Sequence, residues 1–171
     1  MIHLKTPLKR GDIEHLTAGE FIYLSGTVVT GRDSAHQRAL EEKRFPVNLE
    51  DGVLFHSGPI AKKTANGWDI VAIGPTTSSR MNSMAEEFMD RFGVKVVIGK
   101  GGMNPEIFRG RGIYLAMTGG CAALGARSVK KVKEVHWLDL GMAEAVWVLK
   151  VEKLGPLLVG IDYEGNSLYP S

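Results

Sequence analysis

Short apolar runs that end in glycine are the most regular feature of this chain. Each run is rich in Val, Ile, Leu or Thr and is bounded by Gly, Pro or polar residues, a pattern typical of β-strands. The expected strands cover residues 2–6, 20–30, 54–59, 70–73, 94–98 and 112–117. We expect residues 70–73 to form a buried strand, and the strand at 20–30 to bend or bulge at Gly26.

Helical spacing of apolar residues appears between some of these runs. Residues 84–89 predict one helix. Asp33 or Ser34 is expected to cap another helix, which continues to about Arg44 and is closed by Pro46. The alternation of strands, glycine turns and helices therefore predicts an α/β layer.

The remaining Asn, Gly and Pro residues predict turns, and the pattern of strands and helices changes late in the chain. Residues 62–68 resemble a hairpin loop with an Asn-Gly turn, and Asn104 followed by Pro105 is a helix-start signal. Later strands are expected, with little helix between them, and the end is expected to be frayed. The strands cover residues 132–138, 145–151 and 157–161, and the frayed tail covers 167–171.

No repeat, low-complexity segment or linker divides the chain, so residues 1–171 are expected to form a single α/β domain with a mixed sheet and some antiparallel edges. The 44% apolar and 23% charged residues are typical of soluble globular proteins. A net charge of +2 and the absence of a long basic tract give no support for nucleic-acid binding. Lys130, Lys131 and Lys133 are interpreted as the solvent side of a strand.

The chain has one cysteine, Cys121, which excludes an internal disulfide and a metal or iron–sulfur site held by several cysteines of this chain. No apolar run approaches the length of a membrane span, and no signal-peptide pattern is present. These features lead us to expect a reduced, cytoplasmic setting without a membrane partner.

Residues 74–81, GPTTSSRM, carry the most suggestive chemistry. They lie where the expected strand at 70–73 gives way to a helix, which is where ligands usually bind in an α/β layer. The free N–H groups of the helix start and the guanidinium of Arg80 would favour a carboxylate or phosphate, and Thr76 and Thr77 add hydroxyls that can move a proton or orient water. The alternative is a purely structural helix cap.

Three more glycine turns follow expected strands, at residues 31–32, 56–58 and 99–102. If all four turns share one sheet edge, Arg32, Arg80 and Lys100 surround one cleft without an anionic partner nearby. Two arginines that can each hold a carboxylate through paired hydrogen bonds, beside a compact lysine charge, suit a dicarboxylate.

Each candidate also has a structural interpretation. Arg32 could pair with an acidic residue such as Asp33, and Lys100 could be an ordinary exposed lysine. His56 could be a core histidine bonded to backbone, and His36, one helical turn after Arg32, could only orient that arginine. Cys121 is expected to be a packed residue rather than a nucleophile.

In combination these motifs resemble the β subunit of class I, iron–sulfur-dependent fumarate hydratases, the equivalent C-terminal part of the single-chain enzymes, and the β subunit of L(+)-tartrate dehydratase. The resemblance covers roughly residues 20–165. The matching segments are SGTVVTGRDSAH (25–36), HSGP (56–59), GPTTSSRM (74–81), GKGGM (99–103), GGCAA (119–123) and WLDLGMAEA (137–145).

The resemblance implies a swivelling β/β/α domain and the reversible hydration of fumarate to (S)-malate, a step of the tricarboxylic acid cycle. It implies a [4Fe-4S] cluster carried by a partner α subunit in a heterotetramer, with no metal bound by this chain. It also implies that Arg32 and Arg80 bind substrate carboxylate, supported by Lys100, and that Thr76 takes the proton from carbon. Thr77 and His36 complete the set of candidate residues.

The substrate within the four-carbon dicarboxylates stays open between fumarate, L-tartrate and methylated fumarate, with Gly31 favouring fumarate. A non-catalytic dicarboxylate-binding module is the alternative from another class, and the isolated chain could form a homodimer through the surface meant for the α subunit.

Overall fold

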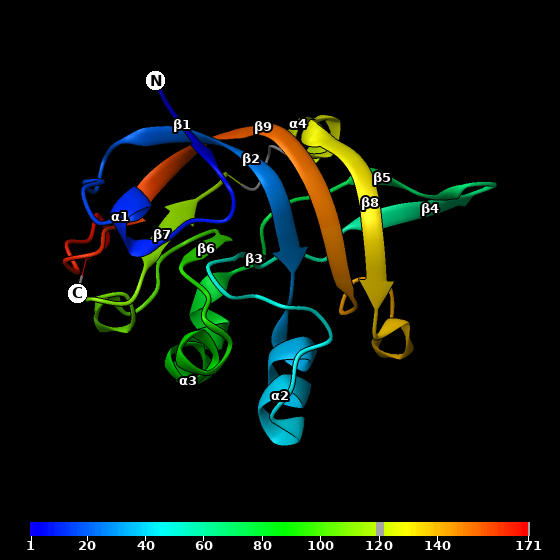
Figure 1. The fold of residues 1–171 in the computed structure, drawn as a ribbon, viewed down its shortest axis with the longest axis horizontal. Coiled ribbons are helices and arrows are strands. Elements are labelled where there is room, and N and C mark those ends of the chain that lie inside the picture. The colour runs from blue at the N-terminus through cyan, green and yellow to red at the C-terminus, as the bar shows by residue number, and fades with distance from the viewer. Residues whose placement is uncertain (119–121, 171) are drawn as a thin grey trace.

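The computed structural model describes residues 1–118 and 122–170 of the chain. Figure 1 shows a mixed sheet with helices beside it, as predicted. The strands in the described part are β1 (Ile2–Lys5), β2 (Phe21–Thr30), β3 (Val53–Phe55), β4 (Ile60–Thr64), β5 (Gly67–Ala72), β6 (Val96–Gly99), β7 (Ile113–Ala116), β8 (Val129–His136) and β9 (Val146–Ile161). The α-helices there are α1 (Arg10–Ile13), α2 (Asp33–Glu42), α3 (Asn82–Phe92) and α4 (Ala122–Ser128). Short 3-10 turns are η1 (Ser78–Met81), η2 (Pro105–Ile107) and η4 (Leu138–Leu140).

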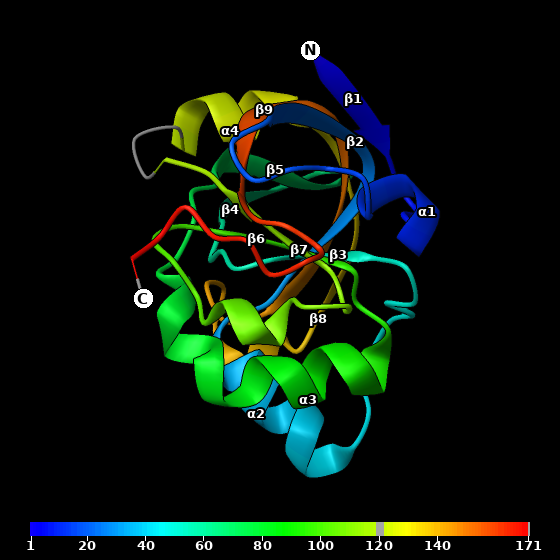
Figure 2. The ribbon, with the colours of Figure 1, turned by 90° about the vertical axis from the view of Figure 1, so that its left-hand side faces the viewer.

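The main sheet closes on itself. Its strand order is β1-β2-β3-β6-β7-β9-β8, and an additional pairing of β2 with β9 joins the two halves into a ring. Neighbours from β1 to β7 run parallel, whereas β9 runs antiparallel to β2, β7 and β8. Figure 2 shows β2 and β9 curving around this ring. The prediction of a mixed α/β architecture is confirmed.

Alternation along the strands divides the apolar side chains between two cores. Val28 and Phe55 belong to the core inside the ring, whereas Val29 and Leu54, their neighbours in the chain, belong to a second core with residues of α2 and α3. Strands that are buried on both faces read as continuous apolar runs, which is why the sequence shows no alternation in them. Figures 1 and 2 agree that α2 and α3 lie on one side of the strands and α4 on the other.

The start of α2 differs from the prediction. The helix begins at Asp33, its N-cap is Arg32, and no side chain of the cap accepts a helix N–H. The Ser34 N–H donates instead to Glu144 Oε1 at 2.9 Å, so a carboxylate from 110 residues away satisfies it. The helix ends at Glu42, and left-handed Lys43 follows (φ 55°) before Pro46 is reached.

A strand is present at residues 70–72, as predicted, but the prediction that it is buried is wrong. Residues Gly67–Ala72 form β5, which pairs with β4 in a separate two-stranded hairpin that projects from the ring in Figure 1. Val71 is 56% exposed, and only Ile73, just after the strand, is fully buried. The hairpin turn itself lies at residues 65–66, within the segment predicted to form it.

The C-terminal third also departs from expectation. The strands predicted at 145–151 and 157–161 are one continuous strand, β9, because its first half pairs with β8 and its second half with β7 while β2 follows most of its other edge. The tail predicted to be frayed is bonded: the Leu168 N–H donates to Gly160 O at 2.9 Å, and the Tyr169 ring packs on Gly160 and Gly102.

Two local predictions are confirmed. The pairing of β2 with β9 shifts register on both sides of Leu24, next to Gly26, which has a left-handed φ of 113°. Asn104 accepts the Glu106 N–H at 3.1 Å and caps the 3-10 turn that starts at Pro105.

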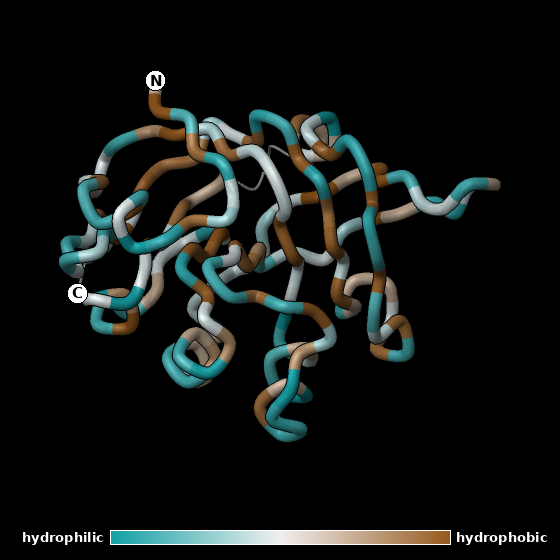
Figure 3. The backbone as a smooth tube through the Cα atoms, in the orientation of Figure 1, coloured by the Kyte–Doolittle hydropathy of each residue, from teal (hydrophilic) through white to brown (hydrophobic). Residues whose placement is uncertain are grey.

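Figure 3 shows β9 as largely hydrophobic and β8 as largely hydrophilic. In the described part of the chain, every helix is too short or too polar to traverse a lipid bilayer.

Candidate functional site

Three of the four glycine turns follow neighbouring parallel strands and therefore meet at one sheet edge. Residues 31–32 follow β2, 56–58 follow β3 and 99–102 follow β6. The Gly31 N–H donates to Phe55 O at 3.0 Å, and the His56 N–H donates to Ile98 O at 2.8 Å, which ties these ends together. The predicted common edge is confirmed for these turns.

The fourth turn reaches the same edge by another route, since the strand before it lies in the hairpin. The Thr76 N–H donates to His56 O at 2.7 Å, and the Thr76 carbonyl accepts the Lys100 N–H at 3.3 Å. The Ser78 N–H then donates to Lys100 O at 3.2 Å. Residues 76–78 are thus inserted between the diverging ends of β3 and β6, which brings Thr76, Thr77 and Lys100 side by side.

The expectation that the cations lack anionic partners is wrong for both arginines. Arg80 Nη2 donates to Asp33 Oδ1 at 2.7 Å, and Arg32 Nε lies 2.9 Å from Glu144 Oε2. The second contact is a charge pair without an aligned hydrogen bond, because Arg32 Nε has no partner of acceptable hydrogen-bond geometry among the described residues. A Cβ at Gly58 would lie 2.7 Å from Arg32 Nη1, so glycine there leaves room for the guanidinium.

The three remaining candidate groups at the edge are accessible. The Lys100 residue is exposed, and Thr76 and Thr77 are half-buried. Thr77 precedes η1 without capping it through its side chain, so the alternative of a structural cap finds no support for Thr77. Lys100 also borders a cavity of about 570 Å³ with mostly apolar lining residues, among them Phe21, Met117 and Leu158, and neither arginine lines it.

Two buried histidines lie behind this edge, and their rings are 5.3 Å apart. His36 Nδ1 is 2.7 Å from Arg32 O and must donate to it, because a carbonyl only accepts. His36 is 1% exposed, so its position suits orientation of Arg32, and substrate contact by its ring stays a prediction. His56 Nδ1 is 2.8 Å from Ser78 Oγ. The Nε2 atom of each histidine is buried and has no hydrogen-bond partner among the described residues.

Ser78 connects the buried layer to the threonines. Its Oγ accepts from the Tyr114 hydroxyl at 3.1 Å as well as bonding to His56. A Cβ added at Gly99 would collide with this oxygen, so Gly99 creates the space for it. Because Ser78 directly follows Thr77, these buried bonds hold the backbone of both threonines.

Electrostatics at this edge keep Asp33 ionised and the two histidines neutral. Burial lowers the pKa of His36, and burial together with His36 and Arg80 holds the pKa of His56 well below its usual range. Burial raises the pKa of Asp33, but the Arg80 hydrogen bond and the charges of Arg80 and Arg32 outweigh it, so that pKa lies below its usual value. At neutral pH the histidines are uncharged and Asp33 is ionised.

The described residues contain no group of three or more His, Cys, Asp or Glu side chains arranged to hold a metal ion. Cys121 and the GGC part of its motif lie outside the described residues. Sequence reasoning missed the roles of Glu144, Ser78 and Tyr114. Glu144 and Ser78 stand within the quoted motifs, which was the available signal, whereas Tyr114 lies in an ordinary apolar strand and has none.

A family model described as "Fumarase C-terminus" matches residues 1–171. This chain belongs to that family. The L(+)-tartrate dehydratase subunit beta of Escherichia coli (strain K12) is 45% identical over 170 residues, covering 96% of this chain and 85% of the relative. The Putative L(+)-tartrate dehydratase subunit beta of Methanocaldococcus jannaschii is 46% identical over 171 residues, covering 95% and 88%.

A third relative is the Putative fumarate hydratase class I of Geobacillus stearothermophilus. It is 34% identical over 174 residues, which cover 99% of this chain but 34% of that longer protein. The predicted resemblance to the β subunits and to part of the longer class I protein is therefore confirmed.

Proposed function

We propose that this chain is the β subunit of a class I hydro-lyase that adds water reversibly to a four-carbon dicarboxylate, with fumarate to (S)-malate as the main reaction. The observation that carries the proposal is the pair of arginines at one edge, each of which already holds a carboxylate of the chain itself. Both sites therefore have the chemistry that a dicarboxylate requires.

The arginines keep donors for a substrate while they bind these carboxylates. A guanidinium has five N–H donors, and among the described residues Arg80 uses only Nη2. We assign Asp33 and Glu144 the task of orienting Arg80 and Arg32, while the remaining donors bind the substrate carboxylates. Lys100 adds a mobile charge beside Thr77.

In the direction of dehydration, a proton leaves the carbon next to a carboxylate and hydroxide leaves the neighbouring carbon. Negative charge then grows on the carboxylate, and Arg32, Arg80 and Lys100 stabilise it. The Thr76 hydroxyl is the proposed group that receives the proton. A threonine is a weak base unless another group takes its own proton, and we assign that group to the partner subunit.

The chain has a single cysteine, which cannot by itself supply the several thiolate ligands of an iron–sulfur cluster. We therefore assign the [4Fe-4S] cluster to a partner α subunit, in an α2β2 assembly, and derive no step through it. The β/β/α domain is proposed to swivel relative to that partner when the substrate is enclosed.

The test is anaerobic co-purification with the iron–sulfur subunit from the same source, followed by assays with fumarate, L-tartrate and mesaconate. Thr76→Ala and Arg80→Ala should each lower kcat/KM by about 10²- to 10³-fold while the assembly stays intact. Arg91→Ala is the matched control, because Arg91 is a half-exposed arginine of α3 that pairs only with Glu87 among the described residues. Full activity in both site variants would overturn the proposed site.

L-tartrate dehydration is the second candidate, because the two relatives of about 45% identity are named L(+)-tartrate dehydratase β subunits, one of them putatively. L-tartrate carries a hydroxyl on both central carbons, so its site needs one more hydrogen-bonding group than malate requires. The ratio of kcat/KM for L-tartrate to that for fumarate decides between them. Dicarboxylate binding by the isolated chain, without activity alongside any α subunit, would favour a binding module.

A further inference from the structure

We propose that the outer wall of the ring carries a second anion site, separate from the strand ends, that binds a small phosphate-type anion. The site, which we term the lysine cradle, borders a cavity of about 430 Å³. Its cationic lining residues are Lys5, Lys131, Lys133 and Lys150.

The strand register places like charges directly opposite each other in the lysine cradle. Lys131 of β8 is paired with Lys150 of β9, and Lys150 is paired on its other side with Thr27 of β2. Like charges in opposite positions of antiparallel strands destabilise a sheet. An anion between the two ammonium groups would remove this repulsion, so the arrangement favours a bound anion.

Lys133 adds a third charge from an irregular position. The register between β8 and β9 shifts between Val132 and Glu134, which leaves Lys133 outside the regular pairing. Its Nζ donates to Thr27 Oγ1 at 3.1 Å, so the side chain crosses β9 to reach β2. Bulges frequently re-aim a side chain beside a binding site, and this irregularity accompanies a Lys133 side chain that reaches Thr27, the residue paired with Lys150.

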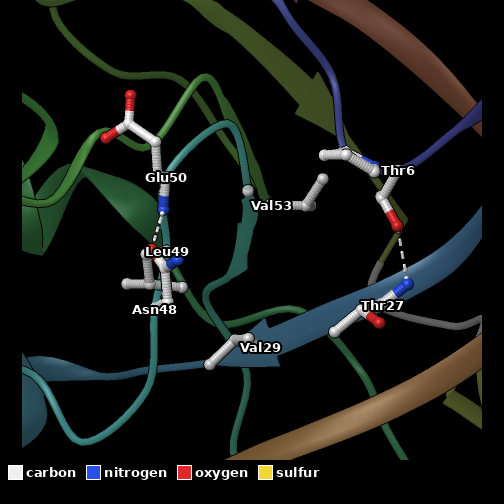
Figure 4. Close-up of a pocket in the computed structure, with 9 residues that line it drawn as sticks. Thr6, Thr27, Val29, Asn48, Leu49, Glu50 and Val53 are labelled. Atoms are coloured by element: carbon white, nitrogen blue, oxygen red, sulfur yellow. Dashed lines mark hydrogen bonds between the residues drawn. The ribbon is translucent and has the colours of Figure 1, made fainter.

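The floor of the lysine cradle is held by a close approach of two strands. The Thr27 N–H donates to Thr6 Oγ1 at 2.7 Å, a bond drawn in Figure 4 from the side of the neighbouring cavity. A Cβ at Gly26 would collide with the Thr6 hydroxyl, and Gly26 has a φ of 113°. The polar floor therefore depends on this glycine, and Lys5 stands next to Thr6 at the end of β1.

No acidic residue lines the lysine cradle, and none of its lysines is in a salt bridge with a described residue. The nearest acid along β8, Glu134, is 2.9 Å from His136 instead. Ammonium groups act as compact point charges that can surround a phosphate from several sides, whereas the planar forks at the strand ends bind one face of a carboxylate or phosphate through paired hydrogen bonds. Diphosphate is the probe that best matches several lysines around one cavity.

The experiment is thermal unfolding of the full-length chain in sodium pyrophosphate and in sodium chloride of equal ionic strength. At about 100 times its Kd, pyrophosphate should raise Tm by about 5 to 10 °C more than sodium chloride does. Lys150→Gln should lose most of this response. Without the anion, the same variant should unfold about 1 to 3 °C higher than the unmodified chain, because the repulsion is removed.

Lys62→Gln, on the exposed hairpin, is the matched control and should keep the pyrophosphate response. Arg80→Ala should keep it as well, which separates the lysine cradle from the strand ends and from the proposed enzymatic function. Equal shifts in pyrophosphate and sodium chloride would overturn the proposal, as would a response that survives in Lys150→Gln or disappears in Arg80→Ala.

Discussion

The strand ends and the lysine cradle are both basic, but they hold their cations in different ways. At the strand ends, Arg32 and Arg80 lie against Glu144 and Asp33, with buried histidines behind them. The lysine cradle has no carboxylate in its lining, and its ammonium groups repel one another across the strands. In the first region the chain's own carboxylates orient the cations. In the second region that task falls to the proposed anion.

The difference shows why a count of positive charges does not identify an active site. A catalytic group must be held in one geometry before the substrate arrives, and the carboxylates and buried bonds at the strand ends supply that order. In the lysine cradle only Lys133, through Thr27, has its ammonium group in a hydrogen bond among the described residues, so the other lysines supply charge on flexible side chains. Three predictions test this contrast, from the largest expected effect to the smallest.

Gly99→Ala should lower the free energy of unfolding by about 3 kcal/mol, because the new methyl group would overlap the Ser78 hydroxyl in a fully packed layer. Chemical denaturation measures this change. Gly11→Ala is the control, since nothing lies within 4 Å of a Cβ at that helical position, and it should be neutral or slightly stabilising. Equal stability of the two variants would contradict the rigid packing we describe at the strand ends.

Acid should weaken the strand ends before it affects the lysine cradle. The unfolded chain binds protons on histidine below about pH 6.5. In the folded state, burial of His36 and His56 lowers their pKa values, so the unfolded chain binds more protons and stability falls as pH falls. Between pH 7 and pH 5.5, His56 should account for up to about 1 kcal/mol of lost stability, and His36 should lower stability in the same direction.

His56→Asn should flatten this pH dependence, while His15→Asn, at an exposed position, should leave it unchanged. The measurement is the unfolding midpoint across the pH range. The slope of the midpoint against pH does not depend on any general loss of stability in the variant. An unchanged slope in His56→Asn would show that His56 binds protons equally in the folded and the unfolded chain, which would contradict the prediction.

Neutralising one charge should have opposite signs in the two regions. Asp33→Asn removes the partner of Arg80 and should lower stability by about 0.5 kcal/mol or less, because both side chains are more than a third exposed. Lys150→Gln should instead raise stability, for the reason given above. Both effects should shrink in high salt, and Glu41→Gln, at an exposed position of α2, should show neither. Chemical denaturation at low and high salt measures the stability of all three variants. A loss of stability in both Asp33→Asn and Lys150→Gln would contradict the difference between the two regions.

Local patterns predicted where many of the strand-end residues lie. Glycine turns after apolar runs marked the ends of β2, β3 and β6, and parallel pairing then placed Arg32 and Lys100 at one edge. The prediction failed at residues 70–73, because an apolar run in a projecting hairpin is as hydrophobic as one in a buried strand. Ile70 packs partly on the ring core while Val71 faces outward, and hydropathy does not separate these cases.

The amino-acid sequence by itself determined the two longest of the described helices, most strands, the glycine turns and the cations that follow them, because these depend on neighbours in the chain. Only the tertiary structure decided which groups those cations and hydroxyls meet. Glu144 reaches Ser34 across 110 residues, and Tyr114 reaches Ser78 across 36. Such contacts depend on how the strands close into a ring, and local propensity carries no information about that closure.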